Sequence, residues 1–286
     1  MRARYFISCV RVEERVNELF DVMSVQNARA KSWAALLDKK HRDRAGRFVV
    51  EGIHLVQEAL RCGAEIEAVV YDGERGLPAE LEQEQALVEQ PELLVSASQA
   101  VMAKCTGTDS PPPVFAVVIK PVASEKALFR EQSLVVVLDG VRDPGNAGTI
   151  IRSADAVGAD AVVLGRGCVD LYNPKTVRST MGSLFHLPVI EADLSQLLPQ
   201  AKERGIRMAA TSLKSAVSCF DCDWTGPTWL VLGSESDGIS PDVLALADQA
   251  VIIPIRGQAE SLNVAMAGTV ILYEALRQRE QYKHNK

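Results

Sequence analysis

The sequence predicts an α/β fold in which a parallel sheet forms the second half of the chain. Three observations lead to this class. Residues 135–164 have the pattern of a strand, a glycine-rich turn, a helix and a second strand in one continuous βαβ unit. Residues 135–138 are an unbroken apolar run, as in a parallel strand that is buried on both faces. Helical and strand patterns then alternate to the end of the chain, which is typical of such sheets.

The length of the chain predicts two domains. Its 286 residues exceed one typical domain of about 100–150 residues, so two separate cores are expected. We expect an N-terminal extension, a small α/β domain, a linker with a helix and the parallel-sheet domain at residues 1–22, 23–120, 121–132 and 133–286. Met23 directly precedes the organised part, so either Met1 or Met23 is the expected native start.

The first domain alternates helices with short apolar strands. Helices are expected around residues 33–37, 55–60, 78–90 and 98–102. Gly63 is expected to end the second helix, and Ser98 to cap the fourth. Strands are expected at residues 48–50, 66–71, 93–95 and 114–119.

A basic turn joins the first helix to the first strand. Residues 39–47 read KKHRDRAGR and contain five lysines and arginines, namely Lys39, Lys40, Arg42, Arg44 and Arg47. This density of positive charge can bind the phosphates of a nucleic acid. Taken alone, the turn is equally well interpreted as a solvated helix end, where the helix dipole favours bases.

The turn after residues 135–138 is the first of three polar elbows, each a loop that follows a strand. Residues 143–145, Asp-Pro-Gly, break the strand, and Asn146 is placed to cap the next helix. Apolar residues recur at helical spacing up to a stop at Gly158, and Arg152 lies off this stripe. Open α/β sheets bind their ligands at the carboxyl ends of the strands, so Arg152 lies near a candidate site.

Two later strands end in similar elbows. Further strands are expected at residues 161–164, 206–210, 229–232 and 251–253. The second elbow follows residues 229–232 and contains Gly233, Glu235 and Gly238. The third follows the last strand and ends at Ser261-Leu262-Asn263, where a mostly apolar helix begins.

Composition and motifs exclude several classes of protein. A formal net charge of −6 gives no overall attraction to nucleic acid, so any RNA binding requires a local basic patch. The first elbow lacks the glycine spacing of a dinucleotide site, and no P-loop sequence is present. Six irregularly spaced cysteines fit a reducing cytoplasm. No segment has the pattern of a signal peptide or a membrane span, so a soluble, cytoplasmic protein is expected.

The remaining chemistry-bearing residues favour structural roles. Cys219 and Cys222 have C-x-x-C spacing but lack the second pair of a zinc site, so buried thiols are expected. The four histidines show no metal-ligand spacing, and no metal is expected. The three tryptophans are expected to pack in the cores.

Taken together, the three elbows resemble the ordered motifs of one enzyme family. Asn146-x-Gly148-x-x-x-Arg152, Gly233-x-Glu235-x-x-Gly238 and Ser261-Leu262-Asn263 are similar to the three motifs of the SpoU (TrmH) family. Its members are S-adenosylmethionine-dependent RNA ribose 2'-O-methyltransferases of the SPOUT superfamily. The first half, which includes Lys31, the basic turn and the strand at residues 48–50, resembles the ribosomal-protein-L30-like substrate-binding domain of members that act on ribosomal RNA.

The resemblance implies a SPOUT fold with a C-terminal trefoil knot and a homodimer whose active sites combine residues of both subunits. It implies catalytic roles for Arg152, Asn146, Glu235, Ser261 and Asn263. It implies that the S-adenosylmethionine pocket is formed by Gly233, Ile253, Leu262, Thr211, Ser234, Ile255 and Gly257. RNA contacts are expected from Lys31, Lys39, Lys40, Arg42, Arg44 and Arg47, and no membrane partner is expected.

Ribosomal RNA is the expected substrate because the first domain is attached. Two alternatives stay open from the sequence alone: a tRNA 2'-O-methyltransferase that shares the catalytic half, and a non-catalytic RNA-binding protein on the same fold. The resemblance implies that Arg152 is the base that takes the proton of the ribose hydroxyl. This role is open as well, because a guanidinium normally keeps its proton; an adjacent RNA phosphate as the base, or a purely electrostatic role of Arg152, is the alternative.

Overall fold

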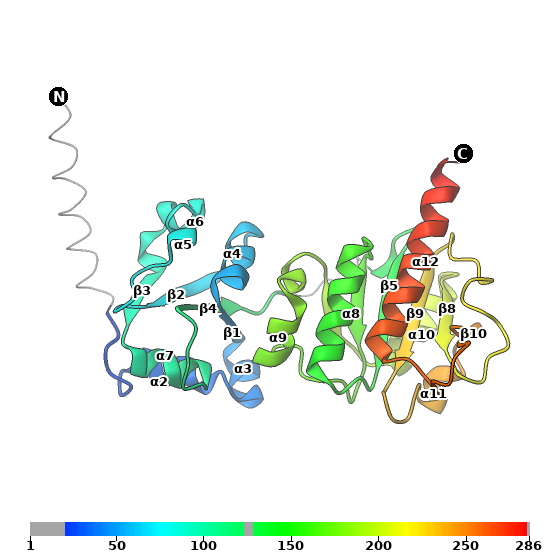
Figure 1. Cartoon of the computed structure of the whole chain (residues 1–286), viewed down its shortest axis with the longest axis horizontal. Coiled ribbons are helices and arrows are strands. Elements are labelled where there is room, and N and C mark those ends of the chain that lie inside the picture. Colours follow the sequence, from blue (N-terminus) through cyan, green and yellow to red (C-terminus); the bar gives the residue numbers. More distant parts are fainter. Residues whose placement is uncertain (1–20, 123–127, 285–286) are drawn as a thin grey trace. The chain divides into compact units, whose positions relative to one another are not determined.

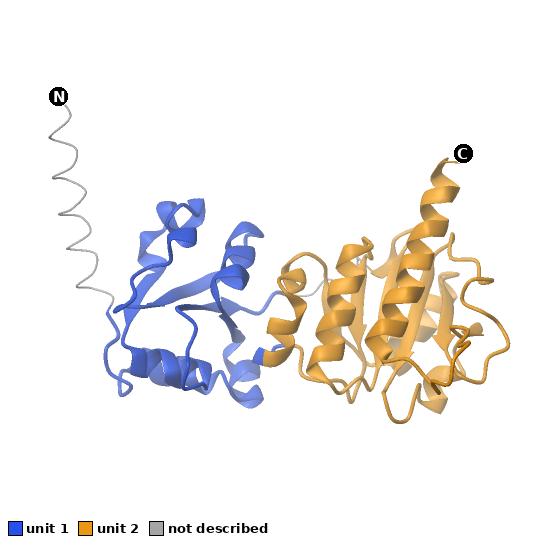
Figure 2. Ribbon diagram, in the orientation of Figure 1, with its two compact units in different colours: residues 1–121, 172–174 blue, residues 122–171, 175–286 orange. Residues whose placement is uncertain are grey.

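The structure, a computed structural model, describes residues 21–122 and 128–284. The expected N-terminal extension therefore lies almost wholly outside the described residues, as does the middle of the expected linker. The described residues form two compact units, shown in Figure 2. One unit contains those up to Pro121 together with Tyr172–Pro174, and the other contains those of Val122–Leu171 and Lys175–Lys286. The grouping of Tyr172–Pro174 with the first unit departs from the expected single block over residues 133–286.

The first unit is built on a four-stranded mixed sheet. Its strands are β1 (Arg47–Glu51), β2 (Ile66–Asp72), β3 (Leu94–Ala97) and β4 (Val114–Ile119), and their order is β1-β4-β2-β3. Strand β4 is antiparallel to both neighbours, whereas β2 and β3 are parallel. All four strands were expected from the sequence, and the structure confirms each within two residues.

Within residues 21–122, six helices and one 3-10 turn accompany this sheet. They are α2 (Ala28–Ala35), α3 (Lys39–Ala45), α4 (Ile53–Arg61), α5 (Ala79–Glu82), α6 (Gln85–Glu89), α7 (Gln99–Thr106) and η1 (Pro91–Leu93). Trp33 and Phe115 pack edge to face in the core, with ring centroids 6.0 Å apart. The single helix expected over residues 78–90 is wrong. The helix is interrupted at Glu84, whose backbone is extended and whose carboxylate is held by Gln57 and Arg61 of α4.

The second unit is built on a six-stranded sheet that is parallel throughout. Its strands are β5 (Leu134–Asp139), β6 (Ala161–Leu164), β7 (Val189–Glu191), β8 (Arg207–Thr211), β9 (Thr228–Gly233) and β10 (Gln249–Val251). The order is β10-β8-β9-β5-β6-β7. The predicted parallel sheet is confirmed. Strand β7 was not predicted, and β10 begins two residues earlier than expected.

Helices cover both faces of this sheet. They are α8 (Pro144–Ala156), α9 (Pro174–Thr180), α10 (Leu194–Glu203), α11 (Pro241–Leu244) and α12 (Val264–His284), with a 3-10 turn η3 (Ser183–Phe185). Helices α8 and α12 run side by side (Figure 1), and the hydroxyls of Ser153 and Thr269 join them at 2.7 Å. Helix α10 packs on the other face, where its Leu197 and Leu198 share a core with Val135 and Val137.

Because all six strands are parallel, their carboxyl ends lie along one edge of the sheet, and the three elbows follow β5, β9 and β10 at this edge.

None of the helices in the described part of the chain is long and apolar enough to span a bilayer.

Candidate active site

A chain of side-chain hydrogen bonds joins the three elbows. Asn146 Nδ2 donates to Glu235 Oε1 at 2.6 Å. Asn263 Nδ2 donates to Asn146 Oδ1 at 2.9 Å. The sequence places these residues far apart, and the parallel sheet brings them together because each follows a strand at the same edge. The grouping of these three predicted catalytic residues is therefore a property of the fold.

Asn263 has a second task, which fixes the direction of its side chain. Its Oδ1 accepts hydrogen bonds from the backbone N–H groups of Ala265 at 2.9 Å and Met266 at 3.3 Å, so it caps helix α12. With the oxygen used in this way, the amide nitrogen is left to point toward Asn146. The cap thus orients one of the three members of the hydrogen-bond chain.

The helix-capping role expected for Asn146 is wrong. Asp143 is the N-cap of α8, and its Oδ1 accepts from the backbone N–H of Asn146 at 2.8 Å. Pro144 follows at the first helical position, where its missing N–H costs nothing. Because Asp143 takes the cap, the side chain of Asn146 is available to bridge Glu235 and Asn263.

Gly148, the second residue of the first motif, is required by packing. A Cβ on Gly148 would lie 2.3 Å from the Cβ of Ser179, at the end of α9. Only a glycine lets α8 come this close to α9, and the approach fixes the position of the helix that carries Asn146 and Arg152.

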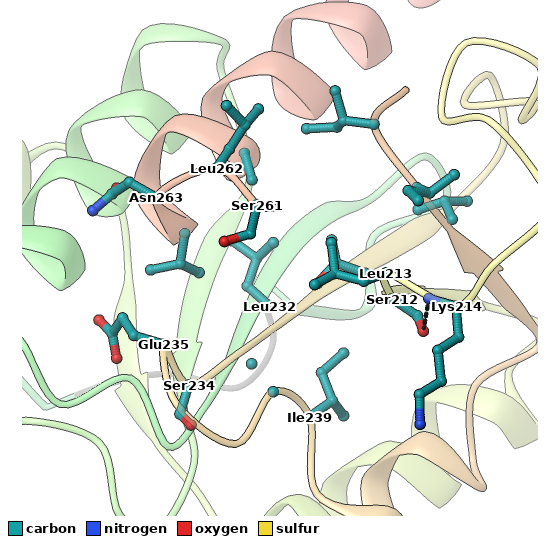
Figure 3. A pocket seen from close by; sticks show the side chains of 18 of the residues that line it. Ser212, Leu213, Lys214, Leu232, Ser234, Glu235, Ile239, Ser261, Leu262 and Asn263 are labelled. Carbon is teal, nitrogen blue, oxygen red and sulfur yellow. Dashed lines mark hydrogen bonds between the residues drawn. The ribbon is translucent and has the colours of Figure 1, made fainter. Parts of the chain in front are cut away.

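A cavity of about 630 Å³ opens beside Glu235 and Asn263, two members of the hydrogen-bond chain (Figure 3). This volume is within the range of about 300–1,000 Å³ that small-molecule sites occupy. Six of the seven predicted cofactor residues line it, namely Thr211, Gly233, Ser234, Ile253, Ile255 and Leu262. The predicted catalytic residues Glu235, Ser261 and Asn263 line it as well. Gly257 is not among the lining residues, so its expected contact with a cofactor is not supported.

Gly233 shapes the wall of this cavity. The backbone of Ser234 and Gly238 forms a tight turn through two hydrogen bonds of 2.9 and 3.1 Å. A Cβ on Gly233 would lie 2.2 Å from backbone atoms of Gly238 and Ile239. The second elbow can therefore fold back on the end of β9 only when residue 233 is glycine, and this turn holds Glu235 at the cavity mouth.

The loop after β8 is a part of the site that the sequence interpretation missed. Ser212, Leu213 and Lys214 line the cavity, although only Thr211 was predicted there. Their place directly after a predicted parallel strand was a usable signal, because ligands bind at such strand ends. Leu213, Leu244 and Leu262 are 64%, 40% and 42% exposed, and all three line the cavity, so a bound ligand with an apolar part would cover them.

Comparisons with known proteins identify the family to which this site belongs. Residues 133–273 match the model of the SpoU rRNA methylase family, and residues 27–116 match that of the MRM3-like substrate-binding domain. The chain is 36% identical to the 23S rRNA (guanosine(2553)-2'-O)-methyltransferase RlmP of Bacillus subtilis, over 88% of this chain and 97% of that protein. The chain belongs to the SpoU rRNA methylase family. The predicted family resemblance is confirmed.

Two further relatives are similar to this chain over nearly all of its length. The 23S rRNA (uridine(2479)-2'-O)-methyltransferase of Streptomyces viridochromogenes is 37% identical, over 89% of this chain and 91% of that protein. The crystal structure of the SpoU methyltransferase AviRb from the same organism, in complex with AdoMet, is similar with a TM-score of 0.81 and 36% identity. That similarity covers 89% of this chain and 99% of that one.

In this SpoU chain Arg152 lies apart from the cavity. It is exposed on α8, and within the described ranges neither a hydrogen bond nor an ion pair engages its side chain. It is not one of the lining residues. The structure of one chain therefore does not bring Arg152 together with Glu235, Ser261 and Asn263 around the cavity.

The residues of the basic turn form helix α3 up to Ala45 rather than a turn, and they are less available to RNA than the sequence suggested. Arg42 is only 2% exposed, and its Nη1 donates to the carbonyl of Leu36 at 2.6 Å. The expected RNA contact of Arg42 is corrected, because its guanidinium is used inside the fold. Arg47 forms an ion pair with Glu67.

Other bases of the first unit remain at the surface. Lys39 pairs with Asp43 at 3.6 Å. Lys31, Lys40 and Arg44 are exposed, and they make no ion pair with any residue that the structure describes. These three side chains are therefore the predicted RNA contacts that the geometry leaves free to bind phosphate.

The C-x-x-C pair has the buried character expected of it. Cys219 and Cys222 are free thiols that are 0% and 3% exposed. Burial raises the pKa of the Cys219 thiol to about 11, and it also raises the pKa of Cys222. Both thiols therefore stay protonated at neutral pH, which does not suit a metal ligand or a redox nucleophile. All three tryptophans are fully buried, as expected.

Proposed function

We propose that this protein transfers a methyl group from S-adenosylmethionine to a ribose 2'-hydroxyl of ribosomal RNA, of the 23S type. The observation that carries the proposal is the hydrogen-bond chain of Asn263, Asn146 and Glu235 at the mouth of a cavity of cofactor size. The relatives reported above, which match about nine-tenths of the chain, carry 23S rRNA 2'-O-methyltransferase names, and this supports the proposal.

The cavity suits S-adenosylmethionine by its chemistry. Its isoleucine and leucine side chains can pack on an adenine ring, and the exposed ones are covered when the ligand is bound. Backbone groups of the loops after β9 and β10 can recognise the polar edge of the base. Glu235 places a carboxylate at the wall of the cavity, and its negative charge would suit the positively charged sulfonium of this ligand. When bound, S-adenosylmethionine supplies an electrophilic methyl group.

The residues around the cavity account for the remaining requirements of the reaction. A ribose hydroxyl is a weak nucleophile, so it must be aligned with the methyl group and lose its proton. Asn146 and Asn263 hold each other and Glu235 in one arrangement, which can orient the ribose without a large reorganisation. Ser261 adds a hydroxyl at the same mouth. Arg152 stabilises the negative charge that develops on the 2'-oxygen, whose proton passes to an adjacent RNA phosphate or to water as the methyl group leaves the sulfur.

A homodimer explains the place of Arg152. Helix α12 exposes Met266, Val270 and Tyr273 at helical spacing. A contiguous apolar stripe on a helix surface is typical of an interface between proteins. Helix α8 packs beside α12, so Arg152 lies near the stripe. In our proposal Arg152 therefore completes the active site of the partner subunit rather than that of its own chain.

The first unit favours ribosomal RNA over tRNA as the substrate. The match of residues 27–116 to a substrate-binding domain gives this unit a role in RNA recognition. Lys31, Lys40 and Arg44 supply the positive charge for phosphate contacts.

We include in the proposal the domain division at residues 121–132, the trefoil knot around the cavity loops, and a cytoplasmic location. The five free thiols among the described residues fit a reducing compartment.

The experiment that tests this function maps ribose methylation in total RNA from cells with and without the gene. One ribosomal nucleotide should lose its 2'-O-methyl group in the deletion strain. The wild-type gene should restore it, and a gene that encodes Arg152→Ala should not. A methyl group lost only from tRNA would support the tRNA alternative, and an unchanged map would support the non-catalytic one.

A further inference from the structure

Two exposed arginines lie on neighbouring loops at the carboxyl edge of the second sheet, outside the cavity. Arg142 lies in the first elbow, between β5 and α8, and Arg166 lies in the loop after β6. The backbone hydrogen bonds of Gly165 to Leu138, 2.8 Å, and of Val169 to Val141, 2.9 Å, join the two loops. The two loops are therefore joined on the β6 side of the first elbow. The strands whose loops line the cavity, β8, β9 and β10, lie on the other side of β5.

Each arginine is held by a carboxylate of another loop. Arg142 pairs with Asp237 in the loop after β9, a residue that lines the cavity, with Nη2 and Oδ2 3.8 Å apart and side chains 69% and 71% exposed. Arg166 reaches over β7 to Asp193 at 2.9 Å, and its side chain is 86% exposed. Such solvent-exposed ion pairs contribute little to stability, so another anion can displace the carboxylate.

The two ion pairs lie on opposite sides of the adjacent ends of β5 and β6, toward β9 and toward β7, and this arrangement suits an extended anion. The sheet order β9-β5-β6-β7 places the ends of β9 and β7 three strand spacings apart, which is about 14 Å. A guanidinium group binds a phosphate through two parallel N–H groups, and this geometry makes arginine the preferred residue for such contacts. A hollow of about 380 Å³ beside Arg166 leaves room for part of a nucleotide.

We propose that Arg142 and Arg166 form a clamp for two backbone phosphates of the RNA on either side of the first elbow. The clamp carries the RNA strand across the carboxyl edge of the sheet and past Asn146. This inference rests on the function proposed above and adds to it a substrate-positioning site within the catalytic unit. On binding, each arginine exchanges an aspartate for a phosphate, and no covalent step is involved.

The test measures RNA binding by the full-length protein at several salt concentrations, with an in vitro transcript of 23S rRNA as the probe. The double variant Arg142→Ala/Arg166→Ala should bind more weakly. The slope of log K against log salt concentration should be less steep by about 0.7 for each lost phosphate contact. Its KM for RNA should rise while kcat and S-adenosylmethionine affinity stay near those of the wild type. A double variant with wild-type salt dependence and KM overturns the proposal.

Two further variants separate phosphate binding from structural effects. Arg130→Ala is the matched control. Arg130 is 65% exposed and paired with Asp160, but it precedes β5 and so lies at the amino ends of the strands, away from the elbows. Its salt dependence should equal that of the wild type. Asp193→Asn keeps the cap of α10, since asparagine caps helices as well as aspartate, and it releases Arg166 from its carboxylate. It should bind RNA severalfold more tightly, and unchanged affinity contradicts the clamp.

The two proposals can fail separately. RNA binding is measured without S-adenosylmethionine and does not depend on methyl transfer. If the wild type binds RNA through both arginines but transfers no methyl group, the clamp stands and the proposed function fails. If the wild type methylates RNA and the double variant does so with the same KM, the clamp alone fails.

Discussion

Asn146 donates its side-chain amide to Glu235 at 2.6 Å, although 89 residues separate the two along the chain. The bond joins the first elbow to the second, and Asn263 extends it to the third. Both partners lie at the protein surface rather than in a core, so this bond contributes little to folding. Its most direct consequence is the shape of the polar site at the cavity mouth.

Glu235→Gln tests the charge in this bond. Glutamine keeps the length and one oxygen acceptor but removes the negative charge beside the cavity. We expect kcat for methyl transfer to fall roughly tenfold or more. Because Glu235 is exposed, the free energy of unfolding should change by about 0.5 kcal/mol or less. Single-turnover transfer and urea denaturation measure the two quantities, and a loss of stability equal to the loss of rate would contradict this assignment.

Asn263 allows its two tasks to be separated. Asn263→Ala removes both the cap of α12 and the donor to Asn146, so it should lower the free energy of unfolding by about 1 kcal/mol and also impair turnover and cofactor affinity. Asn263→Asp keeps the capping oxygen but has no N–H group. It should have near wild-type stability and remain defective in methyl transfer. Normal turnover in Asn263→Asp would show that the donor to Asn146 is not needed.

Two glycines of the predicted pocket should respond differently to alanine. Gly233→Ala places a Cβ 2.2 Å from backbone atoms of Gly238 and Ile239, so it should disturb the second elbow and weaken S-adenosylmethionine binding strongly. A Cβ on Gly257 meets nothing within 4 Å, and Gly257 does not line the cavity. Gly257→Ala is therefore the matched control. Calorimetry should find its affinity near that of the wild type, and equal losses in both variants would contradict the pocket assignment.

The role of Arg152 in methyl transfer can be tested by substitution. Arg152→Ala should lower the rate of methyl transfer by roughly a hundredfold or more and leave S-adenosylmethionine affinity nearly unchanged, because Arg152 does not line the cavity of its own chain. Arg152→Lys should not rescue transfer, since an ammonium group lacks the planar fork.

Mixing two inactive variants separates the cis and trans arrangements of Arg152. A mixed dimer of Arg152→Ala and Glu235→Ala has one complete site if the two residues come from different subunits. Random mixing should then restore about a quarter of wild-type activity, because half of the dimers are mixed and each has one working site. Absence of any restored activity in verified mixed dimers would place Arg152 in the site of its own subunit.

The basic turn should divide into binding and structural residues. Lys40→Glu/Arg44→Glu should weaken RNA binding and flatten its salt dependence, because both side chains are exposed and free of ion pairs with the described residues. Arg42→Ala should instead lower the free energy of unfolding, by about 1–3 kcal/mol, since Arg42 is buried and donates to Leu36. Filter binding measures the effect on RNA affinity, and thermal denaturation measures the effect on stability. A normal salt dependence in the double variant would show that the basic turn is a solvated surface without phosphate contacts.

The sequence predicted the sheets well because most of their strands are continuous apolar runs. Residues 135–138 could be recognised as a buried parallel strand, and the structure extends this strand by one residue at each end. Strand β7 could not be found in the same way. It has three residues, of which only Val189 and Ile190 are buried, and its conformation is set by pairing with β6.

The errors in the site arose where a tertiary contact outweighed a local rule. Asn146 has a good capping side chain, but Asp143 also does and is one turn earlier. Arg42 lies in a run of exposed bases, and only the folded turn directs it inward to Leu36. The meeting of Asn146, Glu235 and Asn263 follows from the order of the parallel strands, which the residue pattern does not give. The family resemblance predicted only that the three residues share a catalytic role.

Methyl transfer in vitro is the direct test of the proposed function. The purified wild-type protein is incubated with labelled S-adenosylmethionine and an unmodified 23S rRNA transcript, and the labelled RNA is hydrolysed in alkali. A 2'-O-methylated ribose blocks cleavage of the adjoining phosphodiester, so the label should be recovered in one alkali-resistant dinucleotide. Label in single nucleotides would mean base methylation, and no label in the RNA would mean no transfer; either result would contradict the account.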